Sequence, residues 1–455
     1  MSELPKGWVE SSLIDLAKFI DYRGRTPKKT EEGIPLITAK NIKDGFINRE
    51  PREFIAEADY DGWMTRGIPK VGDVLLTTEA PLGNVAQIDI EEKFALAQRA
   101  ICFQFYESEV ERFIYYYLRS PLFNQELGLN STGSTVKGIK AATLKKLPVH
   151  IAPLAEQKRI VEKLDEVLAQ VDTIKARLDG IPALLKRFRQ SVLASAVSGK
   201  LTSQDVSTQS SLVGDPWSHE VKAPSHWNLY EFKQAVKITG GSQPPKSEFK
   251  AEYEEGLVRL IQIRDYKSDK FLVYIPLDKA KRFCTEKDIM IGRYGPPIFQ
   301  ILRGISGAYN VALMKAEPAI DDLDLEYLYR FLQNPKLFHY IDAGSDRTAG
   351  QAGVNKKFLE SYPLFVPPLE EQKEIVRLVD QYFAFADTIE AQVKKAQARV
   401  DNLTQSILAK AFRGELVPQN DDDEPAEVLL ERIAQARADA EALAKAAKKA
   451  GKKKA

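Results

Sequence analysis

Two long stretches of the chain carry apolar residues at alternating steps of four and three positions. The pattern holds from Ile160 to Leu178 and returns from Ile375 to Ile407. This spacing places the apolar side chains on one face of a helix, where they form a heptad seam. We therefore predict two coiled-coil helices, which occupy residues 151–202 and 367–416.

Proline and glycine mark the expected ends of both helices. Pro153 and Pro368 stand near the first turns, where a proline needs no amide donor. Gly199 and Gly414 predict the C-terminal caps. Pro182 falls inside the first pattern, and we expect a break or kink there, because an interior proline loses a backbone hydrogen bond and clashes with the preceding turn.

The segments before each helix have a different pattern. Short β-branched or aromatic runs are bounded by turn signals, as in 34–38, 73–78 and 100–106, and one helical run lies near 110–118. This mixture predicts α+β structure.

The two predicted helices are copies of one sequence. At an offset of 215 residues, positions 153–201 and 368–416 are identical at 21 of 49 places. A weaker similarity continues upstream, where Trp8 and Trp227 follow related motifs. The chain is therefore a tandem repeat of a globular unit and a helix. The expected domains are residues 1–150, the helix 151–202, a linker 203–222, a second globular domain 223–366, the helix 367–416 and a C-terminal helix with a basic tail, 417–455.

This repeat predicts an α+β architecture in which two globular α/β units are separated by two long antiparallel coiled-coil helices. A helix of about 45 residues is roughly 68 Å long. If the helices pair antiparallel, the chain acquires an internal pseudo-two-fold repeat. The globular units have diverged far more than the helices, which indicates one shared task for the helices and two different tasks for the globular units.

Composition narrows the class of protein. The 455 residues, 44% of them apolar, are enough for several packed domains. No apolar run approaches the length of a membrane span, and the first residues lack the order of a secretory signal, so we expect a cytoplasmic protein without membrane contact. Cys102 and Cys284 stand far apart without metal-binding spacing, and we expect both in the core.

The net charge of +1 argues against a chain that coats nucleic acid by bulk electrostatics. Any affinity for DNA must come from local clusters or from partner subunits. The lysine-rich end of the chain is expected to be a solvated tail rather than a DNA-binding arm.

Catalytic motifs are weak. Residues 240–247 are similar to a phosphate-binding loop, but Pro245 replaces the glycine before the lysine and offers no amide to a phosphate. Residues 295–299 faintly resemble a catalytic tetrapeptide of amino-methyltransferases, but Gly295 has no side chain to accept a hydrogen bond from an amine. We predict neither a catalytic nor a metal site.

The repeated motif Leu-Pro-x4-Pro-Leu-x-Glu-Gln-x2-Ile, at 147–160 and in a variant at 362–375, resembles the helical regions of type I restriction-modification specificity subunits. The resemblance spans nearly the whole chain. It implies two target recognition domains that bind the two halves of a split sequence in double-stranded DNA. It also implies assembly with two methyltransferase subunits and two restriction subunits. The chain itself would bind no cofactor, and S-adenosylmethionine, ATP and Mg are expected on the partners.

Residue chemistry selects the candidate DNA contacts. Phosphates attract lysine, arginine, hydroxyls and backbone amides, while base edges favour bidentate arginine, asparagine, glutamine or acids. In the first domain the candidates are Arg23, Arg25, Lys28, Lys40, Asn41, Thr77, Thr78, Glu79, Ser134, Thr135, Lys137 and Lys140. In the second domain they are Lys246, Gln262, Arg264, Arg293, Tyr294, Arg347, Gln351, Asn355 and Lys356.

Two alternatives stay open. A pseudo-dimeric coiled-coil protein scaffold without DNA binding would keep the repeat and the helices. A self-sufficient enzyme would need chemistry that the motifs do not supply. The divergence of the globular units beside similar helices favours the DNA-recognition subunit.

Overall fold

The computed structural model describes residues 4–23, 26–133, 136–202, 207–348 and 351–452. The chain forms two compact units: residues 1–178 with 395–455, and residues 179–394. The boundaries cross both long helices, so each unit contains part of each helix. The sequence had placed the helices in domains of their own, and the difference arises because the heptad faces pack into the cores of the globular parts.

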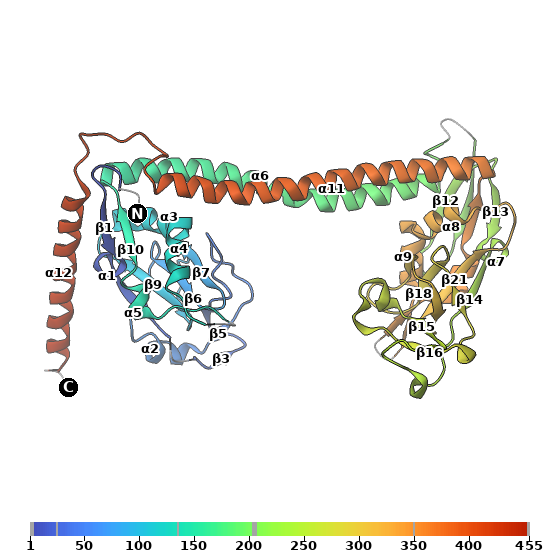
Figure 1. Cartoon of the computed structure of the whole chain (residues 1–455), viewed down its shortest axis with the longest axis horizontal. Helices are drawn as coiled ribbons and strands as arrows, with labels where there is room; N and C mark the ends of the chain where they lie inside the picture. The colour runs from blue at the N-terminus through green and yellow to red at the C-terminus, as the bar shows by residue number, and fades with distance from the viewer. Residues whose placement is uncertain (1–3, 24–25, 134–135, 203–206, 349–350, 453–455) are drawn as a thin grey trace. The chain divides into compact units, whose positions relative to one another are not determined.

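The two predicted helices are present as α6 (Leu154–Ala196) and α11 (Leu369–Ala411). They run antiparallel within each unit (Figure 1). In unit 1, Lys175 forms an ion pair of 2.8 Å with Asp401, and in unit 2 Arg189 pairs with Asp387 at 2.6 Å.

The expected break at Pro182 is wrong, because α6 continues through it. Val171 and Val192, on either side of the proline, are buried in clusters that also contain residues of α11. This packing outweighs the single backbone hydrogen bond that the proline removes.

The shared Glu-Gln motif anchors the start of each helix in the same way. Glu156 accepts a hydrogen bond of 3.0 Å from the indole of Trp8, and Glu371 accepts one of 3.2 Å from Trp227. The following glutamine donates to the carbonyl five residues upstream, at 2.8 Å for Gln157. The repeated motif thus makes equivalent contacts that attach each long helix to its globular domain.

The predicted glycine caps are confirmed. Gly199 and Gly414 have φ values of +75° and +72°, which favour glycine. A Cβ atom on Gly199 would lie 2.3 Å from a ring carbon of Pro224, and one on Gly414 would lie 2.7 Å from Pro5. In both units the end of one long helix therefore packs against the start of a globular domain.

Each unit contains two four-stranded sheets: the first has the same strand order in both units, whereas the second shares three corresponding strands and carries its fourth strand at the opposite edge. In unit 1 the strand orders are β2 (Ala17–Asp21), β9 (Ala100–Phe105), β6 (Val74–Thr78), β7 (Leu82–Gln87) and β3 (Lys29–Thr30), β5 (Phe54–Ile55), β4 (Ile34–Ile37), β8 (Ala95–Leu96). In unit 2 they are β14 (Val236–Gly240), β21 (Leu313–Pro318), β18 (Ile289–Gly292), β19 (Gln300–Leu302) and β16 (Tyr274–Pro276), β15 (Leu257–Ile261), β20 (Gly307–Tyr309), β17 (Phe283–Cys284).

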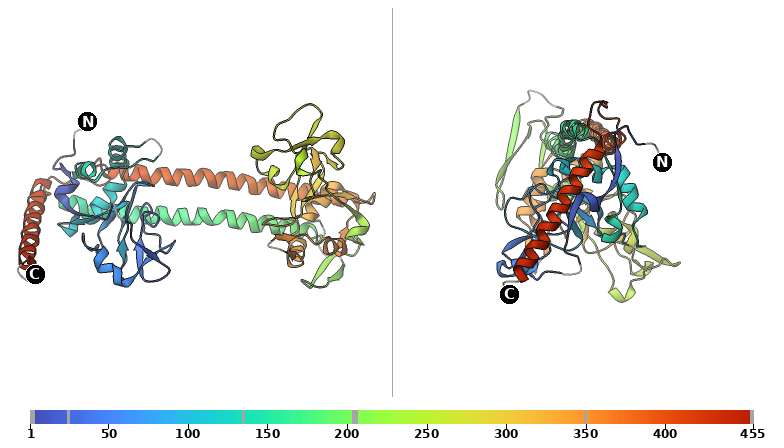
Figure 2. Two further views of the ribbon diagram at one scale, coloured as in Figure 1. Left: turned by 90° about the horizontal axis from the view of Figure 1, so that it is seen from below. Right: turned by 90° about the vertical axis from the view of Figure 1, so that its left-hand side faces the viewer.

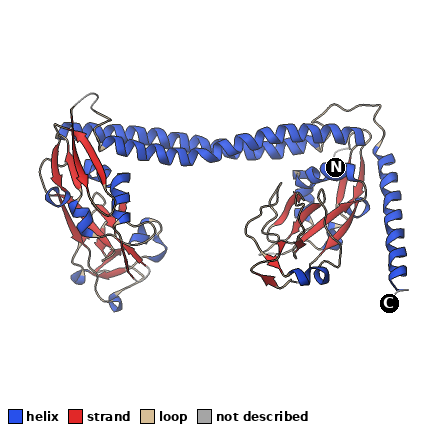
Figure 3. Ribbon diagram, turned by 180° about the vertical axis from the view of Figure 1, so that it is seen from behind, coloured by secondary structure: helices blue, strands red, loops and turns tan. Residues whose placement is uncertain are grey.

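Shorter elements complete the repeat (Figure 3). The paired strands β1 (Val9–Ser12) and β10 (Pro148–Ile151) correspond to β13 (Asn228–Glu231) and β24 (Pro363–Val366). The unit 1 helices are α1 (Leu13–Leu16), α2 (Tyr60–Trp63), α3 (Glu111–Arg119), α4 (Pro121–Leu129) and α5 (Ala141–Leu144). Those of unit 2 are α7 (Phe232–Ala235), α8 (Leu325–Leu332), α9 (Pro335–Ala343) and α10 (Lys356–Ser361), and unit 2 also has the hairpin β22 (Asp346–Thr348) and β23 (Gln351–Gly353).

Strand alternation divides the core of unit 1 into two layers. Leu76 and Phe103 belong to the cluster that includes α3 and the long helices, whereas Leu75 and Cys102 face the second sheet. Cys102 and Cys284 are both buried, as predicted. Burial raises the pKa of the Cys102 thiol, which fits a core residue.

The structure contradicts one predicted segment, the linker 203–222, and confirms another, the C-terminal helix. The expected linker 203–222 is wrong, because β11 (Thr208–Val213) and β12 (His219–Pro224) form a hairpin whose Val213 and Val221 pack into the core of unit 2. The expected C-terminal helix is confirmed as α12 (Ala426–Lys452), which runs beside α1 (Figure 2). None of the described helices is both long and apolar enough to span a bilayer.

Candidate DNA-recognition clefts

The turns after β6 and β18 share one backbone frame. Thr78 donates its amide to the carbonyl of Arg99 at 2.9 Å and accepts the amide of Ile139 at 3.0 Å. At the equivalent place in unit 2, Arg293 donates to Ala312 at 2.9 Å and accepts from Val354 at 2.9 Å. The following residues, Glu79 and Tyr294, form isolated bridges with Gly138 and Gly353.

The 215-residue offset therefore extends into these turns, although their side chains differ. Thr78 of unit 1 corresponds to Arg293 of unit 2, Glu79 corresponds to Tyr294, and Lys140 corresponds to Asn355. One frame thus presents two different sets of polar groups.

In unit 1 this frame borders a cleft of about 280 Å³. Four sequence-predicted residues line it together: Arg23, Thr78, Glu79 and Lys140. Two residues that the sequence analysis did not select, Gln98 and Arg99, also line it. Arg99 forms an ion pair of 3.0 Å with Glu79, and both side chains are about half exposed.

Arg23 is fixed from within the domain. Its guanidinium pairs with Asp21 at 2.7 Å and donates to the carbonyl of Ile139 at 3.2 Å. Burial alone would raise the pKa of the Asp21 carboxyl, but the hydrogen bonds and charge of Arg23 outweigh it and hold the pKa below its usual value. Asp21 thus stays ionised and keeps the guanidinium at the cleft.

The remaining unit 1 candidates separate into buried and exposed residues. Asn41 and Thr77 are buried, and their side chains hydrogen-bond to neighbouring backbone at Thr38 and Asn84, so both stabilise loops. Lys28 and Lys137 are exposed. Lys40 is exposed and lies 3.6 Å from Glu53, and it borders a second cleft that shares Gln98 and Arg99 with the first. Arg25, Ser134 and Thr135 lie outside the described residues.

In unit 2 the turn after β18 borders a cleft of about 890 Å³. Arg264 and Tyr294, both predicted, line it together with Lys267 and Gln300, which were not. The guanidinium of Arg293 lies 5.2 Å from the ring centre of Tyr294, a cation–π distance that positions both side chains.

The other unit 2 candidates have mainly local partners. The side chain of Gln262 accepts from the backbone of Asp265 in a capping box, and Asn355 caps α10 through the amide of Lys357. Lys356 pairs with Glu360 at 3.2 Å, and Lys246 is exposed. The backbones of Arg347 and Gln351 lie in β22 and β23, but their side chains are outside the described part of the chain.

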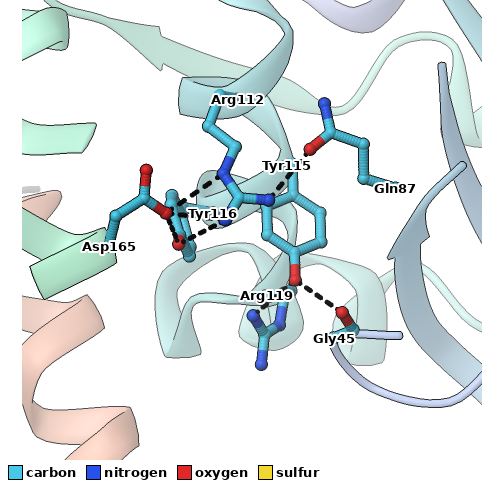
Figure 4. A network of polar contacts seen from close by, with 7 residues as sticks. All are labelled: Gly45, Gln87, Arg112, Tyr115, Tyr116, Arg119 and Asp165. Carbon is cyan, nitrogen blue, oxygen red and sulfur yellow. Dashed lines mark hydrogen bonds and ion pairs between the residues drawn. The ribbon is translucent and has the colours of Figure 1, made fainter. Parts of the chain in front are cut away.

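A polar network joins the first globular domain to α6 (Figure 4). Asp165 of α6 pairs with Arg112 of α3 at 2.6 Å and accepts a hydrogen bond from the hydroxyl of Tyr116. On α3, the hydroxyl of Tyr115 donates to the carbonyl of Gly45 at 2.8 Å, and Arg119 donates to that hydroxyl at 2.8 Å. The network orients the domain, and with it the cleft, on the helix.

The missed residues come from turns that sequence alone did not connect. Gln98 and Arg99 precede β9, and they reach the cleft because β9 pairs with β6. Lys267 follows a short 3-10 helix beside the turn after β18. The sequence shows the polar pair Gln98-Arg99 just before β9, but only the pairing of β9 with β6 places this pair at the cleft.

The arrangement suits binding rather than catalysis. Both clefts contain arginine, lysine, glutamine and one acid, which is Glu79 in unit 1 and Asp342 in unit 2, and the unit 2 cleft adds Tyr294. These are groups that contact phosphates and base edges. Among the described residues, no group of three or more histidine, cysteine, aspartate or glutamate side chains could hold a metal ion.

Comparison with known proteins gives a consistent family. Residues 5–183 and 224–397 match the family model described as "Type I restriction modification DNA specificity domain". Among curated proteins, the chain is 31% identical to the type I restriction enzyme EcoKI specificity subunit of Escherichia coli strain K12, with 99% of both chains covered. It is 32% identical to the EcoBI specificity subunit of Escherichia coli, covering 98% of this chain and 95% of that protein.

Solved structures show the same fold. A chain from a study of complex assembly and conformational transition of the type I R-M system aligns with a TM-score of 0.67 at 19% identity, covering 91% of this chain and all of that one. The HsdS subunit from Thermoanaerobacter tengcongensis aligns with a TM-score of 0.51 at 19% identity, covering 91% and 99%.

Proposed function

Because the chain belongs to the specificity subunits of type I restriction-modification systems and is the non-catalytic DNA specificity subunit of such a system, we propose that its two clefts bind the two halves of a split DNA target. The observation that carries this proposal is the shared frame around Thr78 and Arg293. The frame carries different side chains in the two units, and two domains that recognise different DNA sequences require such a difference.

The proposed contacts follow the exposure of the side chains. In unit 1 they include Arg23, Glu79 and Lys140 at the cleft, with Lys28, Lys40 and Lys137 as exposed cations nearby in sequence. In unit 2 they include Arg264, Arg293 and Tyr294, with Lys246 and Lys356. The buried Asn41 and Thr77 are left out, because their polar atoms are engaged inside the loops. Arg25, Ser134, Thr135, Arg347 and Gln351 keep their place in the hypothesis from their sequence positions. Asn355, whose side-chain oxygen caps α10, stays in it as the residue that corresponds to Lys140 of unit 1.

We further propose that two methyltransferase and two restriction subunits assemble on the chain in the cytoplasm. Apolar side chains remain exposed on the long helices: Ile174 and Leu403 in unit 1, and Leu184, Tyr382 and Phe385 in unit 2. Exposed apolar groups of this kind favour protein contacts. The modest net charge of the chain also suits a subunit whose partners supply much of the phosphate affinity.

S-adenosylmethionine, ATP and Mg are assigned to those partners. The one loop with a phosphate-binding appearance ends in Pro245, which has no amide, and a 3-10 helix begins at Lys246. These residues do not fit a nucleotide phosphate.

The proposal is tested in host cells that express the partner subunits, with and without this chain. Methylation-aware sequencing of their DNA gives the methylated motif in each case. We expect a split motif only when the chain is present. Replacing residues 9–151 by the equivalent segment of a relative should change one half of the motif and leave the other half intact. An unchanged motif would favour the scaffold without DNA binding.

A further inference from the structure

Arg99 has a backbone conformation that its fold does not require. Its φ is +72°, in the left-handed region that residues other than glycine rarely adopt. Ala312 occupies the equivalent place before β21 and accepts the same backbone hydrogen bond without a positive φ. The start of this interior strand can therefore form without the strained backbone, so the strain in unit 1 calls for a reason in the Arg99 side chain.

The Arg99 side chain is directed to Glu79 at the cleft. Its Nε lies 3.0 Å from Oε1 of Glu79, with side-chain exposures of 50% and 45%. Ion pairs this exposed contribute little to stability. Folding stability therefore does not explain why the chain tolerates a disfavoured backbone to form this pair.

The pair leaves one edge of the guanidinium available. Glu79 faces the Nε side, and within the described residues this ion pair is the polar contact of the Arg99 side chain. The two terminal nitrogens can then donate to a pair of acceptors. Guanine presents such a pair, O6 and N7, in the major groove, and arginine is the residue that most often contacts it.

The neighbouring cations suit the DNA backbone instead. Arg23 is held by Asp21, and Lys140 is exposed on the loop that follows α4. A guanidinium already engaged by Asp21 and a lysine ammonium supply positive charge beside the Arg99 fork. This matches the division between phosphate contacts, which position a protein, and base contacts, which specify the sequence.

We propose that Arg99 is a specificity-determining residue that contacts a guanine in the first half of the target, and that Glu79 is a positioning residue that orients its guanidinium. This inference rests on the proposed function. The left-handed backbone of Arg99 is then the conformational cost of aiming the side chain into the cleft.

The test uses the chain assembled with its methyltransferase partners. Methylation-aware sequencing compares the wild type with Arg99→Lys, Arg99→Gly and Glu79→Gln. We expect both Arg99 variants to relax one guanine position of the first half-site and to lower methylation of the wild-type site at least tenfold. Glu79→Gln should relax the same position to a smaller extent. The second half-site should stay unchanged.

Thermal unfolding separates this role from a structural one. Glycine accepts a positive φ without strain, so Arg99→Gly should unfold at or above the wild-type temperature while losing specificity. Arg52→Lys is the matched control, since Arg52 and Glu50 form an exposed ion pair of 3.2 Å elsewhere in the unit. It should leave the motif unchanged.

Three outcomes would overturn the inference. The first is a motif unaltered at every position in both Arg99 variants. The second is a uniform fall in methylation with no position relaxed, which would make Arg99 a phosphate contact. The third is a large fall in unfolding temperature for Arg99→Gly. If the wild-type chain itself gives no split motif, the proposed function fails; if it does, only the inference about Arg99 is at stake.

Discussion

Glu111 illustrates how the core changes the chemistry of a single residue. It begins α3, where it packs so close to Gly72 that a Cβ atom on that glycine would lie 2.6 Å from its carboxylate. Two causes raise the pKa of Glu111 to about 7: burial is the larger, and repulsion from the Asp73 carboxylate is the smaller. Gly72 and Asp73 are therefore the steric and electrostatic neighbours of the first turn of this helix.

The raised pKa predicts a pH-dependent stability. The folded state holds the proton of Glu111 more tightly than the unfolded chain, so ionising this group costs stability as pH rises from about 4.5 through 7. Glu111→Gln should remove that cost. We expect its free energy of unfolding to exceed that of the wild type by about 1 kcal/mol at pH 8, after allowance for partial exposure, and to match it below about pH 3.5, where the carboxyl is protonated in both states. Denaturant unfolding at the two pH values measures this; an equal difference at both would refute the assignment.

At the scale of elements, the two units fasten their globular domains to the long helices at equivalent positions. Asp165 of α6 binds Arg112 of α3, and Asp380 of α11, 215 residues later, binds Arg330 of α8 at 2.5 Å. The arginines occupy different positions on their helices, so the aspartate is the shared part of this contact. We regard both aspartates as groups that orient the recognition domains.

Loss of this contact should affect orientation and stability but not the bases recognised. Asp165→Ala leaves the buried hydroxyl of Tyr116 and the guanidinium of Arg112 without this acceptor. We expect a loss of roughly 1–3 kcal/mol in the free energy of unfolding. Glu162→Ala, an exposed position one turn away on α6, is the control and should change stability by less than about 0.5 kcal/mol. In sequenced methylation motifs, both half-sequences should persist; a new half-sequence would show that Asp165 does more than orient the domain.

At the scale of the whole molecule, each compact unit takes one end of α6 and the opposite end of α11. A change in only one helix therefore disturbs the pairing in both units. This organisation explains why the helices have stayed similar while the globular domains diverged: each helix has to fit the other and two domains at once.

Length changes should accordingly be tolerated only in pairs. One heptad inserted after Leu178 and another after Lys394 would lengthen both helices by roughly 10.5 Å. We expect the methylated motif to keep both half-sequences and to change only in the number of base pairs between them. A heptad inserted in α11 alone should lower the unfolding temperature and abolish methylation. Altered half-sequences in the paired insertion would contradict a spacer role for the helices.

The sequence by itself determined the repeat, the two long helices, their caps and the helical C-terminal segment, because heptad spacing, prolines and glycines act locally. It also determined the class of function, since the repeated Glu-Gln motif marks the family. Only the tertiary structure decided that α6 continues through Pro182 and that 208–224 forms a hairpin, because packing against distant residues supplies the stabilisation. The same holds for the clefts: Thr78 and Glu79 were predicted, but Arg99 meets Glu79 only because β9 pairs with β6. Burial, likewise, separated Asn41 from the exposed lysines around it.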